Sequence, residues 1–156
     1  MSFLNHYTEQ RIVIAQVDLV WELLSNCSYL SKWMPFIVRV EHLGKDTLSN
    51  GSILWVETIV GDKENQSLCT VVDCLPGRRI AFYSEQEGIK VYYRFELEQK
   101  KHDMVSISMM TEIKMNGLKN RLFRKKIQQE FVSYGWMQLD ALDKAITEYR
   151  TQSKYN

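Results

Sequence analysis

Six cations lie within thirteen residues of the sequence, around the start of a helix expected over residues 118–150. They are Lys114, Lys119, Arg121, Arg124, Lys125 and Lys126. The helix dipole disfavours cations at an N-terminus, so packing within the protein does not explain them. They form either a solvated face or a contact for a phosphate-bearing ligand, anionic lipid or RNA. Phe123 is the one aromatic residue among them and the helical period turns it inward, so no base-stacking platform is predicted.

Gln138 is a second candidate for chemistry. It falls at the centre of the apolar stripe of the same helix, where packing needs no polar residue. A buried amide has two donors and an acceptor to satisfy, and it is costly when they stay unpaired. Gln138 either orients a ligand carbonyl or hydroxyl, or bonds to a sheet residue such as Tyr93 or Thr111.

Glu57 is a third candidate, and its role depends on strand register. Residues 52–60 are apolar on both faces. The inward set is either Leu54, Val56, Thr58 and Val60, or Ile53, Trp55, Glu57 and Ile59. The second register would bury a carboxyl among apolar side chains, where the protonated acid is favoured and acid–base chemistry becomes feasible. The first register hides no charge and is favoured; the register of residues 66–74 stays open.

The remaining reactive residue types form no recognisable site. The three histidines, His6, His42 and His102, share no metal-ligand spacing. The three cysteines, Cys27, Cys69 and Cys74, form no CxxC pair and are expected to be reduced structural residues. No phosphate-binding or nucleophile motif is present, so we predict no metal, no cofactor and no catalytic residue, although a triad assembled in space would escape this test.

Length and charge narrow the classes further. The chain has 156 residues, which suits one domain, and a net charge of +1 gives no global attraction to nucleic acid. The first residues lack a basic region followed by an apolar run, and no stretch approaches 18 apolar residues. We therefore expect a cytoplasmic protein without a membrane span, and a monomer or weak homodimer.

Hydrophobic periodicity predicts the elements that must position these residues. A strand at 9–15 is followed by helices at 17–25 and 28–33, the second ending before Pro35. Strands are expected at 36–43, 52–60, 65–74, 79–84, 89–99 and 103–115. The last two alternate cleanly between apolar and polar residues, which indicates an antiparallel sheet covered on one face. One helix of about 30 residues closes the chain and is apolar on more than one side near 131–139.

Several short motifs follow this element order. Val20-Trp21-x-x-Leu24-Ser25 lies in the first helix, Trp33-Met34-Pro35 at its exit, and Pro76-Gly77-Arg78-Arg79-Ile80 at a mid-sheet turn. Asn116-Gly117-Leu118 opens the final helix, and Leu139-x-x-Leu142 falls late in it. Over residues 8–148 the chain resembles the START-like (Bet v 1-like, SRPBCC) superfamily, in particular its polyketide cyclase/dehydrase and coenzyme-Q-binding branch. The resemblance implies an α+β helix-grip fold, in which a curved antiparallel sheet of about seven strands wraps a long C-terminal helix.

The resemblance also implies an apolar cavity between sheet and helix. Large side chains expected on the inner surfaces would line it and bind a lipid, isoprenoid or polyketide-like molecule; the alternative is that they simply fill the core. The candidate ligand-binding residues are Trp33, Trp55, Phe82, Tyr93, Phe95, Met109, Phe131, Tyr134 and Gln138.

Three functions are compatible with these residues. We favour a non-enzymatic carrier or sensor for a small hydrophobic molecule. The second is a cyclase or dehydratase using Glu57, Tyr93 or Gln138 in the same cavity. The third, less favoured, is a module that binds the ribosome, nucleic acid or another partner through the basic cluster.

Overall fold

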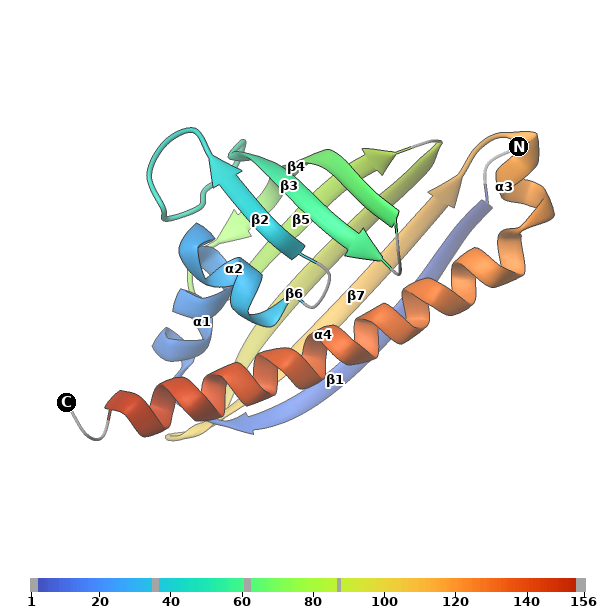
Figure 1. Cartoon of the computed structure of the whole chain (residues 1–156). Coiled ribbons are helices and arrows are strands. Elements are labelled where there is room, and N and C mark those ends of the chain that lie inside the picture. Colours follow the sequence, from blue (N-terminus) through green and yellow to red (C-terminus); the bar gives the residue numbers. More distant parts are fainter. Residues whose placement is uncertain (1–2, 35–36, 61–62, 87, 154–156) are drawn as a thin grey trace.

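The computed structural model describes residues 3–34, 37–60, 63–86 and 88–153, and Figure 1 shows their arrangement. Seven strands form one antiparallel sheet in the order β1-β7-β6-β5-β4-β3-β2. Their bounds are β1 Phe3–Ile14, β2 Ile37–His42, β3 Ile53–Val60, β4 Lys63–Leu75, β5 Arg79–Gln86, β6 Ile89–Lys101 and β7 Met104–Met115. The helices are α1 Val17–Ser25, α2 Cys27–Trp33, α3 Leu118–Leu122 and α4 Arg124–Ser153.

The order of elements is the predicted one, and the fold is the predicted helix grip. Strands β2 to β7 pair each with the next along the chain, whereas β1 pairs with β7 at the other edge. The two short helices α1 and α2 connect the edge strands β1 and β2, and α4 runs along the covered face of the curved sheet (Figure 1). None of the described helices is both long enough and apolar enough to span a bilayer.

Alternating burial assigns each strand an inner face. On β7, Val105, Ile107 and Met109 are at most 2% exposed. On β3, Leu54 and Val56 are buried while Ile53 and Trp55 are exposed. The favoured register of this strand is therefore confirmed, and the sheet turns its hydrocarbon side toward α4 because only that side is covered.

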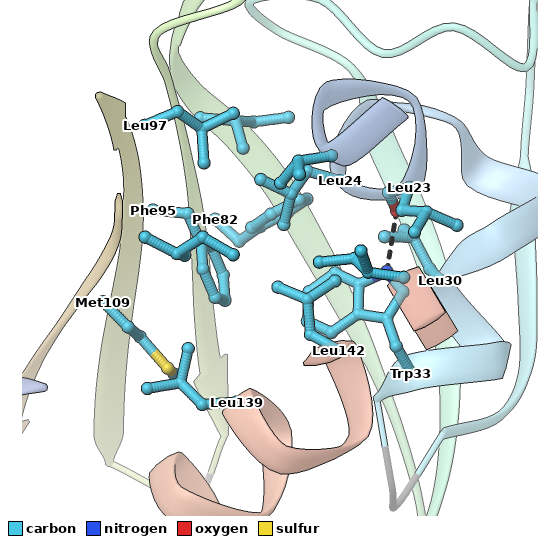
Figure 2. Close-up of a cluster of buried hydrophobic side chains, with 14 of the residues drawn as sticks. Leu23, Leu24, Leu30, Trp33, Phe82, Phe95, Leu97, Met109, Leu139 and Leu142 are labelled. Carbon is cyan, nitrogen blue, oxygen red and sulfur yellow. Dashed lines mark hydrogen bonds between the residues drawn. The ribbon is translucent and has the colours of Figure 1, made fainter. Parts of the chain in front are cut away.

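The packed core joins α1, α2 and α4 to the inner face of the sheet. Trp33 at the end of α2 is fully buried, and its ring meets that of Phe95 edge to face at 5.4 Å between centroids. Leu139 and Leu142 of α4 close the cluster from the helix side (Figure 2). Such edge-to-face pairs add to the hydrophobic stabilisation of a core.

The final helix differs from the prediction. It is broken at Phe123, which separates the single turn α3 from the long α4. Phe123 has φ −105° and ψ 19°, and its side chain is 53% exposed. The expectation that Phe123 points inward was wrong. It assumed one continuous helix through this position, but the helix is interrupted at Phe123, so the helical period does not set the direction of its side chain.

Candidate ligand-binding surface

Three neighbouring strands place hydroxyl-bearing side chains side by side on the inner face of the sheet. Thr111 of β7 is the register partner of Tyr7 on β1 and of Tyr93 on β6. Residues paired in an antiparallel sheet point to the same side, and Thr111 is only 4% exposed. The row Tyr7–Thr111–Tyr93 is therefore a polar stripe across the inner face of the sheet.

Apolar side chains continue this surface beyond the stripe. Val91, Ile113 and Met115 lie on the inner face and are 6%, 0% and 2% exposed. They are buried but do not belong to the packed cluster around Trp33. The inner face thus has two parts: a dense core near α1 and α2, and a second apolar region toward α3.

Gln138 places an amide in this interior. Its side chain lies on α4 and is 9% exposed, and its Oε1 has no hydrogen-bond partner among the residues that the structure describes. The next residue, Leu139, packs beside Met109 of β7 (Figure 2). A buried acceptor without a partner costs about 1–3 kcal/mol, so the protein sustains a cost here that packing alone does not require. The predicted burial of Gln138 is confirmed.

Glu9 is a site residue that the sequence did not single out. It pairs in register with Met109 and therefore lies on the inner face of β1, where its buried Oε2 has no hydrogen-bond partner within the described ranges. Burial raises the pKa of Glu9; Arg11 acts against this and Asp140 adds to it. The alternation Glu9, Arg11, Val13 carried the signal, because Val13 had to face inward and the other two share its phase.

Arg11 ties this part of β1 to α4. Its Nη1 lies 2.5 Å from Asp140 Oδ1 and 3.6 Å from Asp143 Oδ2. These ion pairs hold the helix over β1 close to Gln138.

The predicted aromatic lining divides into three groups. Trp33, Phe82, Phe95 and Met109 are at most 2% exposed and lie in the packed cluster (Figure 2). Tyr93 is partly buried and packs against that cluster. Phe131 and Tyr134 lie outside the residues whose side chains are described. Their part in ligand binding stays a prediction.

Trp55 and Glu57 lie on the opposite face of the sheet. Trp55 is 37% exposed and Glu57 pairs in register with Arg39 of β2. The placement of Trp55 in the lining was wrong, because it shares the phase of exposed Ile53 rather than of buried Leu54. Glu57 therefore supplies no interior carboxyl.

Among the described residues, the cysteines and the other side chains that commonly bind metals form no reactive or metal-binding site. Cys69 faces the interior, and burial raises its pKa to about 12, so this thiol is neutral near pH 7. Burial also raises the pKa of Cys27 and of Cys74. Within the described ranges, no three His, Cys, Asp or Glu side chains are grouped as metal ligands would be.

The sequence has a clear family relationship. Residues 13–133 match the family model described as polyketide cyclase / dehydrase and lipid transport. No curated protein matches the sequence.

Similar solved structures share the fold at low identity. The Zhui aromatase/cyclase from Streptomyces sp. R1128 superposes with a TM-score of 0.79 at 15% identity, covering 93% of this chain and 94% of that one. Norcoclaurine synthase from Thalictrum flavum gives 0.72 at 15% identity, covering 96% and 98%. A Staphylococcus aureus protein of unknown function gives 0.77 at 10% identity, covering 97% and 98%.

Proposed function

Because the chain belongs to the polyketide cyclase/dehydrase and lipid transport family, we propose that it binds a small hydrophobic molecule bearing a hydroxyl group. The molecule would lie between α4 and the apolar part of the inner face that includes Val91, Ile113 and Met115. The family and the similar enzymes support a role in either binding or cyclisation.

The unpartnered Oε1 of Gln138 carries this proposal. An acceptor in an apolar surround gains most from a ligand that brings its own donor, because both groups would otherwise be poorly paired. A hydroxyl or phenol supplies that donor. The Tyr7–Thr111–Tyr93 stripe offers further hydrogen-bonding positions on the facing sheet.

Glu9 favours a second candidate, a cyclase. Burial raises the pKa of the Glu9 carboxyl, which makes its ionised form a stronger base, and Glu9 shares the inner face with Tyr93. In an aldol cyclisation Glu9 would remove a proton from a carbon next to a ketone. That carbon would bond to a second carbonyl of the same molecule, and the resulting alkoxide would take a proton back from Glu9.

A binding experiment tests the first function. Displacement of the fluorescent probe anilinonaphthalene sulfonate by a long-chain alcohol is compared with displacement by the methyl ether of that alcohol. We expect the alcohol to bind about tenfold more tightly, and Gln138→Leu to abolish that preference. Gln152→Leu, an exposed position on the same helix, is the matched control and should keep it.

Two results would overturn the proposal: no displacement by either compound, or an unchanged preference in Gln138→Leu. Mass analysis of organic extracts from the protein purified from its own host would then identify the natural ligand. Turnover of an extracted polyketide-like compound that is lost in Glu9→Gln would favour the cyclase over the carrier.

A further inference from the structure

The short helix α3 has its polar and apolar sides reversed relative to a packed helix. Asn120 is 9% exposed, whereas Leu118 and Leu122 are 74% and 73% exposed. The two leucines are one turn apart and so share a side. Phe123, at the break before α4, is 53% exposed. Three large apolar side chains are thus exposed to solvent at one corner of the fold. A single exposed apolar side chain is ordinary on a protein surface, but a group of three suggests a contact surface.

The strands hold α3 in this orientation. Asn120 Nδ2 donates to the backbone oxygen of Asn116 at 2.7 Å, and the Asn116 amide donates to the oxygen of Gly88 at 2.9 Å. A Cβ at Gly88 would stand 2.8 Å from that Asn116 oxygen. The turn between β5 and β6 therefore packs directly under α3, and this contact keeps the polar side of the helix inward and its leucines outward.

The same corner concentrates positive charge. Residues 113–129 hold six Lys and Arg and no acidic residue. The other 14 Lys and Arg and the 19 acids leave the rest of the chain at −5. Lys119, Lys125 and Lys126 are all exposed. The chain is nearly neutral as a whole, so this corner is positive against a negative body.

We propose that α3, Phe123 and the first turn of α4 dock onto an anionic lipid bilayer. Leu118, Leu122 and Phe123 would enter the interface while the cations contact lipid phosphates, the combination that holds basic amphipathic segments on membranes. RNA would use the cations but leave the leucines in water, so the apolar side chains decide for lipid. This surface lies at the end of α4 opposite the C-terminus, beside the start of β1 (Figure 1).

Docking here would bring the second apolar region of the inner face close to the membrane. Met115, the last residue of β7, is separated from α3 only by Asn116 and Gly117. The inference does not depend on the proposed function, because vesicle binding is measured without any ligand.

Vesicle co-sedimentation tests the docking surface. The full chain is mixed with vesicles of phosphatidylcholine alone or of phosphatidylcholine with phosphatidylglycerol, at low and at high salt. We expect binding to the anionic vesicles only, reduced by salt. Leu118→Ser with Leu122→Ser, and separately Lys125→Glu with Lys126→Glu, should each weaken it by about tenfold or more.

Matched variants elsewhere on the surface serve as controls. Leu43→Ser changes a leucine that is 100% exposed, and Lys45→Glu with Lys144→Glu reverses two exposed cations outside the cluster. Both should bind like the wild type, and thermal unfolding checks that all variants are folded. The proposal is overturned if anionic vesicles leave the protein in solution, if the α3 variants bind normally, or if the protein binds RNA but not vesicles.

Discussion

The indole Nε1 of Trp33 donates a 2.7 Å hydrogen bond to the backbone oxygen of Leu23 (Figure 2). The bond joins the end of α2 to the last turn of α1, and both residues are at most 1% exposed. One side chain therefore fixes the angle between the two short helices and also packs against Phe95 on the sheet.

Replacing this indole should be costly. Trp33→Phe leaves the Leu23 oxygen buried without its donor and opens space beside Phe95, so we expect the free energy of unfolding to fall by about 2–4 kcal/mol. Urea unfolding measures the change. Trp55→Phe on the outer face is the control and should cost about 1 kcal/mol or less. Equal effects at the two positions would contradict the assignment of Trp33 to the core.

Gln138→Leu should raise stability while it impairs binding. The leucine removes an unpaired acceptor and keeps a similar volume, so the free energy of unfolding is expected to rise by about 1 kcal/mol. Urea unfolding without ligand tests this. A clear loss of stability would mean that the amide is a structural hydrogen-bonding group, and it would remove the main support for the ligand proposal.

Glu9 should make stability decrease as pH rises. Its pKa is higher in the folded protein than in the unfolded chain, so the folded state holds the proton more tightly. The penalty for the buried charge is absent below the ordinary glutamate pKa and complete above the raised one. Glu9→Gln should therefore increase the melting temperature more at pH 7 than at pH 4. An equal change at both pH values would show that burial does not perturb this carboxyl.

Gly88 should tolerate substitution less well than Gly77, although both have positive φ, +79° and +76°. An alanine at Gly77 meets no atom within 4 Å and incurs only the backbone cost, about 1–2 kcal/mol. At Gly88 the added Cβ also collides with the Asn116 oxygen, so we expect Gly88→Ala to cost at least about 1 kcal/mol more. Thermal unfolding of the two variants gives the comparison. Similar losses of stability in the two would argue against close packing between Gly88 and the Asn116 backbone before α3.

The order of the elements along the chain and the inner face could be predicted because they follow from local periodicity, whereas the helix-grip arrangement was implied by the family resemblance. The alternation through Val105, Ile107 and Met109 required one covered face, and hiding no charge favoured Leu54 over Glu57. The prediction that Trp55 lines the cavity was wrong because it rested on the residue being aromatic. Residue type does not determine which face of a strand a side chain occupies. Glu9 was not singled out although it shares the phase of Val13, because a charged residue at the start of a predicted strand is equally typical of the strand's boundary.

The break at Phe123 could not be predicted from the helix itself. Residues 118–150 contain no proline, and the apolar period runs through Phe123 without interruption. The turn at Gly88 binds the backbone of Asn116, and Asn116 in turn accepts a hydrogen bond from Asn120, so contacts outside the long helix orient α3. Tertiary contacts of this kind override helical propensity, and a single sequence gives no measure of them.

The placement of β1 has a consequence for the folding pathway. Strands β2 to β7 form successive local hairpins, whereas Phe3 and Ile14 pair with Met115 and Met104, about 100 residues away. Loop-closure entropy makes such distant pairing slow. Strand β1 can therefore pair only after β7 has been synthesised. A further contact forms once α4 has folded, when Arg150 Nη1 donates to the Ile14 oxygen at 2.8 Å. During synthesis the edge of β7 stays open until then, and amide hydrogen exchange should find β1 the last strand to gain protection.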